Sequence, residues 1–113
     1  MNNWTVIYYF GMGQSPIKKF IEKLSVNLRS KSVRSLELLE EFGLFTSPKY
    51  LKKITGTPLW ELRVLGKISV RYLLIFSQRK EIIILNAFVK KTQKLPLREV
   101  KKAILRLTSI TKL

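Results

Sequence analysis

The spacing of apolar residues changes partway along the chain, and this change limits the folds open to it. After an opening strand, the apolar residues up to Pro48 recur every three or four positions, which predicts helices. Beyond Pro48 they mostly alternate with polar residues, which predicts strands. Because 113 residues support one domain, both parts are expected to pack together in a single α+β domain over residues 1–113.

The first part is predicted to form one strand and two helices. Trp4–Phe10 is rich in β-branched and aromatic residues, and Ser15-Pro16 is typical of a helix start. A break at residues 30–32 would separate the two helices, with Ser32 capping the second and Gly43 ending it. The two helical faces are Ile17, Phe20, Ile21, Leu24 and Leu28, then Val33, Leu36, Leu39 and Phe42. This pattern predicts an antiparallel helical hairpin.

The second part is predicted to form four strands and a helix. The strands are expected at residues 49–54, 59–65, 68–76 and 81–89, joined by short turns into an antiparallel meander. Pro96 would open the last helix, with Leu97, Val100, Ile104 and Leu107 inward and Arg98, Lys101, Lys102 and Arg106 largely outward. The predicted order is β-α-α-β-β-β-β-α: a small antiparallel sheet packed by the helical hairpin and the C-terminal helix.

The composition excludes several kinds of chemistry. The chain has no cysteine, histidine or aspartate, so it cannot hold disulfides, thiolate zinc sites or a Ser-His-Asp triad. We expect no metal and no cofactor, and chemistry based on Lys, Arg, Glu, Tyr, Ser or Thr. The first residues lack the basic segment of a signal peptide, and no apolar run approaches the roughly 18 residues of a membrane span. A soluble, cytoplasmic protein without a membrane partner is therefore expected.

Positive charge is concentrated in the second part of the chain. Residues 1–48 carry six basic and four acidic side chains, a net charge of +2. Residues 49–113 carry sixteen basic and three acidic side chains, a net charge of +13. A field of one sign on part of a small domain attracts polyanions, most commonly nucleic acid. The alternative is a merely solubilising surface.

The central hairpin brings two arginines together. A three-residue loop after Leu65 places Arg63 directly opposite Arg71, whereas a two-residue loop would turn Arg71 into the core as a buried charge, so we expect the first register and Arg71 off the core. Glu61 lies on the same face as Arg63. Two interpretations remain open: a local Glu61–Arg63 ion pair with Arg71 solvated, or a guanidinium clamp for a phosphate.

Two further segments mix cations with aromatic rings. Phe88 precedes Lys90, Lys91, Thr92 and Lys94 at the end of the most apolar strand. The run 49–53 contains Tyr50 beside Lys49, Lys52 and Lys53. Rings beside cations are typical of surfaces that stack a base and hold its phosphate. The alternative for each is an ordinary solvated basic loop.

The chain resembles the RelE/ParE toxin superfamily, and most closely its HigB-like, phage-derived branch. The resemblance is carried by Leu59–Arg63, by Val70–Leu73 and by residues 84–96, which contain a Phe-x-Lys-Lys-Thr run followed by a proline. These segments follow one another in the family's order and spacing. The resemblance covers residues 48–108, whereas the amino-terminal part matches in element order alone.

The resemblance implies a RelE-like fold and the toxin of a type II toxin–antitoxin pair. It further implies a metal-independent, ribosome-dependent mRNA endoribonuclease that drives the ribose 2′-hydroxyl onto the adjacent phosphate. Arg71 would stabilise the phosphate, Arg63 with Lys91 or Lys90 would complete the cradle, and one of these cations or Glu61 would assist proton transfer. RNA would be bound by Lys52, Lys53, Phe88, Thr92 and Lys94.

The same resemblance implies the partners and two alternatives. The expected partners are the ribosome, mRNA and a small antitoxin that covers the basic surface, either an acidic one or a helix-turn-helix, HigA-like one. The chain departs from its relatives in having no histidine, and no tyrosine after Tyr72, for acid–base or stacking roles. One alternative is a ParE-like inhibitor of DNA gyrase that cuts no RNA. The other is a non-catalytic RNA-binding module.

Overall fold

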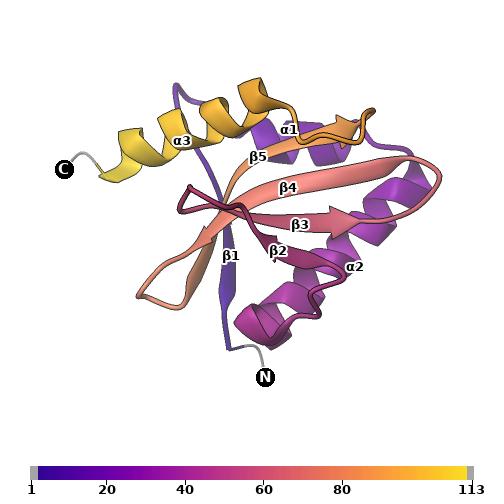
Figure 1. Cartoon of the computed structure of the whole chain (residues 1–113), viewed down its shortest axis with the longest axis horizontal. Helices are drawn as coiled ribbons and strands as arrows, with labels where there is room; N and C mark the ends of the chain where they lie inside the picture. Colours follow the sequence, from indigo (N-terminus) through magenta and orange to yellow (C-terminus); the bar gives the residue numbers. More distant parts are fainter. Residues whose placement is uncertain (1–2, 112–113) are drawn as a thin grey trace.

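The computed structural model describes residues 3–111, and its central element is a five-stranded sheet (Figure 1). The strand order in space is β1-β5-β4-β3-β2. The bounds are β1 Thr5–Tyr8, β2 Leu51–Lys53, β3 Trp60–Val64, β4 Ser69–Phe76 and β5 Glu81–Lys90. Four of these strands are shorter than predicted, whereas β5 extends one residue further, to Lys90. The α+β class and the element order are confirmed.

The sheet is mixed, so the prediction of an antiparallel sheet is wrong for one strand. Strands β2 to β5 form the predicted antiparallel meander, but β1 pairs in parallel with β5, with Val6 opposite Ile82. Parallel neighbours need a long crossover, and here the chain between β1 and β5 contains both helices and three strands. Alternation within β1 could not reveal which distant strand it joins.

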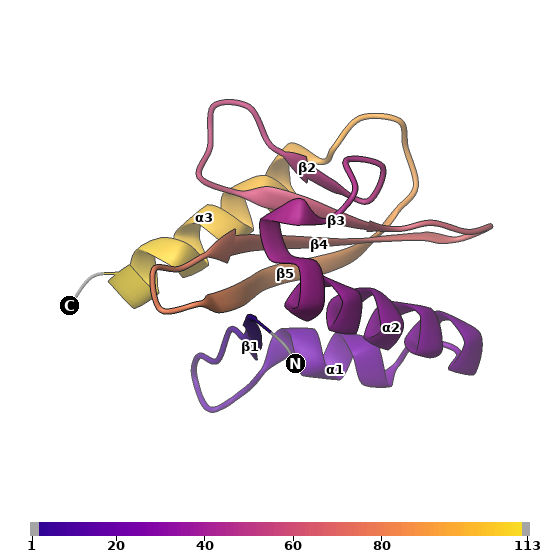
Figure 2. The same ribbon diagram turned by 90° about the horizontal axis from the view of Figure 1, so that it is seen from below.

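Three helices cover the two faces of the sheet. Figure 2 shows α1 (Pro16–Glu22) and α2 (Val26–Phe42) on one side of the sheet and α3 (Leu97–Thr111) on the other. A short 3₁₀ turn, η1 (Gly43–Phe45), follows α2. In residues 3–111, none of the helices has both the length and the apolar content that crossing a membrane requires.

The boundary between the first two helices differs from the prediction. The break lies at residues 23–25, because Ser25 caps α2 by accepting a hydrogen bond from the amide of Leu28 at 3.3 Å. Residues 30–32 continue the helix. The predicted cap, Ser32, is instead buried inside α2, where its Oγ accepts a hydrogen bond from the Tyr72 hydroxyl at 2.7 Å. A serine inside a helix is tolerated when a partner such as Tyr72 satisfies it.

The core is divided by the sheet into two clusters. The larger cluster packs α1 and α2 against the sheet face that carries Leu62, Val64, Val70, Tyr72 and Leu74, which confirms the predicted apolar face of the hairpin. The smaller cluster packs Val100 and Ala103 of α3 against Leu59, Leu73, Leu85 and Phe88.

The predicted inward face of α3 is confirmed for Val100, Ile104 and Leu107, which pack in the smaller cluster, but not for Leu97. Leu97, predicted inward, is 66% exposed because it lies at the helix start, beyond the sheet contact. Ala103 is fully buried in its place. Arg106, predicted outward, is half-buried and donates from Nη1 to the carbonyl oxygen of Leu85 at 2.8 Å.

Candidate functional site

The register of β3 and β4 places Arg63 directly opposite Arg71, as predicted. The neighbouring pair Leu62 and Tyr72 points into the larger core cluster. Since side chains alternate along a strand, Arg63 and Arg71 lie on the other face, which is the face covered in part by α3. The two guanidinium groups therefore start from adjacent positions on one side of the sheet.

One carboxylate lies against both arginines. Glu61 Oε1 is 3.3 Å from Nε of Arg63, and Glu61 Oε2 is 3.1 Å from Nε of Arg71. The Arg63 contact is a hydrogen bond, whereas the Arg71 contact is an ion pair without hydrogen-bond alignment. The three side chains together carry a net charge of +1. We call these two arginines together with their shared carboxylate, Glu61-Arg63-Arg71, the arginine pair.

The arginine pair is more buried than predicted. The side chains of Glu61 and Arg71 are 6% and 8% exposed, while that of Arg63 is 29% exposed. Burial lowers the pKa of the Arg71 guanidinium, Glu61 opposes this, and the like charge of Arg63 adds to it. The expectation of Arg71 off the core is therefore wrong in part: its face is right, but neighbouring side chains on that face enclose it. The interpretation with Arg71 solvated is contradicted.

Three further predicted residues share the face of the arginine pair. Lys52 of β2 is opposite Glu61, and Phe88 of β5 is opposite Arg71. Lys90 is two residues beyond Phe88 and therefore points the same way. Lys52 is exposed and Lys90 half-buried, so cations extend across the sheet on both sides of the pair. The sheet thus brings residues from four strands to one surface.

Phe88 does not offer the open ring that base stacking needs. Only 7% of the residue is exposed, because it packs in the cluster beneath α3. Its predicted role as a stacking platform is therefore unsupported. The ring instead forms part of the wall of a hollow of about 570 Å³ at the end of β5. Lys91 and Thr92 also line this hollow, together with Arg98 and Glu99 from the start of α3.

The remaining predicted residues lie elsewhere. Lys53 is opposite Trp60, on the face of α1 and α2, and its Nζ donates to the carbonyl oxygen of Thr57. Lys94 is exposed in the loop before α3, where its carbonyl oxygen accepts a hydrogen bond from Thr92 Oγ1 at 3.0 Å. Neither lines the hollow beside Phe88. The expected RNA-binding set is thus divided between two faces and a loop.

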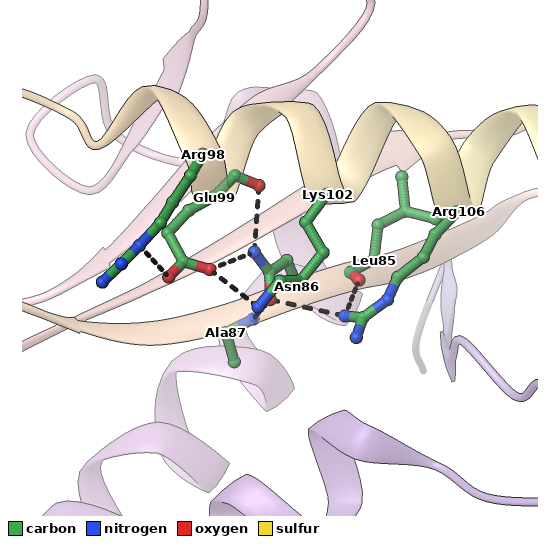
Figure 3. Close-up of polar contacts among 7 residues, drawn as sticks. All are labelled: Leu85, Asn86, Ala87, Arg98, Glu99, Lys102 and Arg106. Carbon is green, nitrogen blue, oxygen red and sulfur yellow. Dashed lines mark hydrogen bonds and ion pairs between the residues drawn. The ribbon is translucent and has the colours of Figure 1, made fainter.

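A polar network that the sequence analysis did not single out holds α3 onto β5 (Figure 3). Asn86 is buried, and its Nδ2 donates to the carbonyl oxygen and to Oε1 of Glu99 at 3.0 and 2.9 Å. Glu99 also forms ion pairs with Arg98 and Lys102 at 3.8 and 3.5 Å.

The network depends on an irregularity in the sheet. The register shifts beside Leu73, so that Leu85 is an extra residue in β5 and both Leu85 and Asn86 face α3. Arg106 donates to the carbonyl of Leu85 and, at 3.4 Å, to Oδ1 of Asn86. An asparagine inside an apolar run such as Ile84–Phe88 is the signal that could have found this network.

The arrangement suits anion binding rather than metal chemistry. Within residues 3–111 there is no group of three or more acidic, cysteine or histidine side chains that could hold a metal ion. The arginine pair, Lys52 and Lys90 instead present positive charge on one face. Guanidinium groups bind phosphate oxygens in bidentate fashion, and ammonium groups bind them as point charges.

A comparison with models of protein families gives a match to this chain. The family model described as "Phage derived protein Gp49-like (DUF891)" matches residues 19–108. This range includes α2, all four strands of the meander and most of α3. A search of curated proteins gave no match.

Proposed function

Since the chain belongs to the Gp49-like family of phage-derived proteins, a family of RelE-like toxins in type II toxin–antitoxin systems, we propose that it cleaves mRNA on the ribosome. In this proposal residues 1–113 act as one toxin domain of the HigB-like branch. Its partners are mRNA, the ribosome and a helix-turn-helix antitoxin of the HigA type.

The proposed reaction is an internal transesterification of RNA. The ribose 2′-oxygen attacks the adjacent phosphorus, and the bond from phosphorus to the 5′-oxygen of the next nucleotide breaks. A base accepts the 2′-hydroxyl proton and an acid donates a proton to the leaving 5′-oxygen. The products are a 2′,3′-cyclic phosphate and a 5′-hydroxyl end. Negative charge builds on the phosphate oxygens in the transition state, so fixed cations accelerate the reaction.

The observation that carries the proposal is the excess of positive charge in the arginine pair. Two guanidinium groups lie against one carboxylate, at 3.3 and 3.1 Å, on a sheet face that also carries Lys52 and Lys90. A purely structural ion pair needs only one cation for each carboxylate. The second cation, held in place before any ligand binds, favours an anionic ligand such as the reacting phosphate.

The different burial of the two arginines suggests different roles. Arg63 is the more exposed, so we assign to it the direct contact with the phosphate. Arg71, which is buried, supplies fixed positive charge and holds Glu61 in place through their ion pair. Both oxygens of Glu61 face guanidinium groups, which favours a positioning role over that of general base. Lys90 and Lys91 remain the proposed groups for proton transfer.

The test uses purified protein with ribosomes translating a defined mRNA. We expect cleavage within the translated region, with 5′-hydroxyl ends that accept phosphate from a polynucleotide kinase. Intact mRNA in this assay, with the protein shown to be folded, would refute the proposal.

A parallel reaction distinguishes the inhibitor of DNA gyrase. It contains gyrase and supercoiled plasmid in place of ribosomes and mRNA. We expect unchanged supercoiling activity and no cleaved DNA, because the arginine pair suits a phosphate ligand and not a protein target. Accumulation of gyrase-linked DNA breaks, with mRNA left whole, would instead support the ParE-like alternative. Binding of RNA without cleavage would support the non-catalytic module.

A further inference from the structure

Glu99 is an acid in the wall of a hollow whose other charged lining residues are basic. This hollow, called the β5 hollow below, has a volume of about 570 Å³ and lies at the end of β5, beside the start of α3. Its charged lining residues are Lys91, Arg98 and Glu99, with a net charge of +1. A site for phosphate alone would gain nothing from a carboxylate, because the two repel each other. The β5 hollow therefore suits a ligand that carries hydrogen-bond donors as well as negative charge.

The fold holds the Glu99 carboxylate in one position. Oε1 accepts a hydrogen bond from Nδ2 of the buried Asn86 at 2.9 Å, and the same nitrogen donates to the carbonyl oxygen of Glu99 at 3.0 Å (Figure 3). Only 14% of the Glu99 side chain is exposed. A side chain that is fixed before a ligand binds loses little conformational freedom on binding. Glu99 is therefore suited to distinguish one ligand from another.

Both oxygens of this carboxylate can still accept hydrogen bonds. Within residues 3–111, Oε2 accepts no hydrogen bond, and its contact with Arg98 Nε, at 3.8 Å, is an ion pair only. Oε1 accepts one hydrogen bond from a side chain, and a carboxylate oxygen can accept two. Two neighbouring donors of a ligand can therefore bind the two oxygens side by side.

Apolar side chains form the rest of the lining and suit the faces of a base. They are Phe88, Val89, Pro96 and Leu97. Leu97 is 66% exposed at the start of α3, so its side chain is available to a ligand. Proteins that take a single base into a pocket hold its faces between aromatic or apolar side chains and recognise its edge by hydrogen bonds. The β5 hollow combines both features.

The β5 hollow adjoins the arginine pair. Phe88 lines the hollow and is opposite Arg71 in the register of β4 and β5. Residues that are directly opposite in antiparallel strands have Cβ atoms about 4.5–5.5 Å apart. Lys91, a proposed group for proton transfer, also lines the hollow. A base in the hollow would therefore belong to a nucleotide next to a phosphate bound at the arginine pair.

We propose that the β5 hollow binds a guanine base of single-stranded RNA and that Glu99 recognises it. The Watson–Crick edge of guanine presents two neighbouring donors, the N1–H and the N2 amino group, which match the two oxygens of a carboxylate. Adenine, cytosine and uracil each present a single donor group on this edge and leave one carboxylate oxygen without a new partner. The place of this base beside a reacting phosphate rests on the proposed function, whereas the chemistry of the hollow does not.

The experiment follows amide chemical shifts of the unmodified protein as trinucleotides are added. The probes are UpGpU, UpApU and UpIpU, in which I is inosine. All three carry the same charge, so nonspecific attraction to the basic protein is equal. Inosine keeps the N1–H of guanine and lacks its N2 amino group, so UpIpU isolates one of the two proposed hydrogen bonds.

We expect UpGpU to bind about tenfold more tightly than UpIpU and UpApU, with shift changes centred on residues 88–99. Equal affinities for the three probes would overturn the proposal, because they would show binding by charge alone. So would tighter binding of UpApU, shift changes centred on other residues, or the absence of binding.

A matched pair of variants tests the role of Glu99. Glu99→Gln and Glu37→Gln each remove one negative charge, and Glu37 is exposed on α2, outside the hollow. The glutamine oxygen at position 99 can still accept the hydrogen bond from Asn86, but the amide nitrogen replaces an acceptor by a donor. We expect Glu99→Gln to bind UpGpU and UpIpU equally and Glu37→Gln to keep the tenfold preference. A preference retained in Glu99→Gln would overturn the proposal. The comparison of UpGpU with UpIpU on the unmodified protein tests it even if Glu99→Gln does not fold.

A free guanine nucleotide could supply the same base, so guanosine 5′-monophosphate is tested beside UpGpU. We expect it to bind more weakly, because it lacks the second phosphate that would lie at the arginine pair. Tighter binding of the mononucleotide would overturn the assignment to RNA. None of these measurements requires cleavage. A preference for guanine with mRNA left intact would support the hollow and refute the proposed function, and cleavage on ribosomes without such a preference would do the reverse.

Discussion

Glu61 and Arg71 face each other from adjacent strands, with Oε2 of the carboxylate 3.1 Å from Nε of the guanidinium and both side chains more than nine-tenths buried. A buried charge whose partner is removed keeps its desolvation cost without compensation. This pair therefore couples the proposed chemistry to the stability of the sheet, and the two effects must be measured separately.

The first prediction concerns stability. Arg71→Met is expected to lower the free energy of unfolding by about 1–3 kcal/mol, because the buried Glu61 would lose one of its two cations and keep only the hydrogen bond from Arg63. Urea unfolding followed by circular dichroism measures the change. The matched control is Arg98→Met. Arg98 also forms an ion pair, with Glu99, but its side chain is 89% exposed. Equal urea midpoints of unfolding for the two variants would contradict a stabilising role of the buried Glu61–Arg71 ion pair.

The second prediction concerns catalysis. Arg63→Ala is expected to reduce the rate of mRNA cleavage by about 10²–10³-fold, the usual effect of removing one preorganised donor. Because Arg63 is part-exposed, the variant should remain folded. Single-turnover cleavage on ribosomes measures the rate, and Lys18→Ala serves as a charge-matched control on α1. A rate unchanged by Arg63→Ala would remove Arg63 from the mechanism.

The third prediction uses two adjacent lysines on opposite faces of β2. If about four phosphates are contacted, log affinity for single-stranded RNA should fall with log salt at a slope near −3. Lys52 lies on the face of the arginine pair and Lys53 on the other. Lys52→Ala is expected to reduce the slope by about 0.7, and Lys53→Ala to leave it unchanged. The same slope for both variants would place the RNA elsewhere.

The fourth prediction concerns alkaline pH. Burial raises the pKa of Tyr72 to about 12, and the hydrogen bond to Ser32 opposes the shift. The unfolded chain loses this proton near pH 10. The contribution of Tyr72 to the free energy of unfolding is therefore fully present below pH 10 and is lost as the pH rises from 10 to 12. The loss should reach about 2–3 kcal/mol for this group. Urea unfolding across this range measures it, with Tyr72→Phe as the control. If Tyr72→Phe leaves the slope unchanged, another group such as Tyr8, whose pKa is also raised by burial, is responsible.

The fifth prediction concerns the attachment of α3. Asn86→Ala removes both hydrogen bonds to Glu99, leaving the bond from Arg106 to Leu85. Amide hydrogen exchange in α3 should then become roughly tenfold faster, since a broken buried hydrogen bond costs about 1–3 kcal/mol. Exposed Lys101→Ala on the same helix is the control. Faster exchange throughout the sheet would indicate general destabilisation instead of release of α3.

Local patterns were sufficient to predict the strands and the central hairpin. Alternation in β3 and β4 assigns Leu62 and Tyr72 to one face and Arg63 and Arg71 to the other, because a slip by one residue would bury an unpaired charge. Which strands pair with each other was harder to predict. Nothing in Thr5–Tyr8 indicates that β1 pairs in parallel with β5, about 75 residues away in the chain.

Helix positions were predicted less well where a polar side chain had two possible uses. Ser32 was the predicted cap, but it accepts a hydrogen bond from Tyr72 of a distant strand, and Ser25 caps the helix instead. Asn86 presents the same difficulty in β5, because its partner Glu99 becomes a neighbour only when α3 has packed.

The sequence by itself determined which side chains share a face of a strand and where positive charge is concentrated, because both follow from residue order and composition. Only the tertiary structure decided that Arg71 is enclosed and that Lys53 is separated from the arginine pair by the thickness of the sheet. Burial and enclosure depend on which distant elements pack together, and that depends on the free energy of the whole fold.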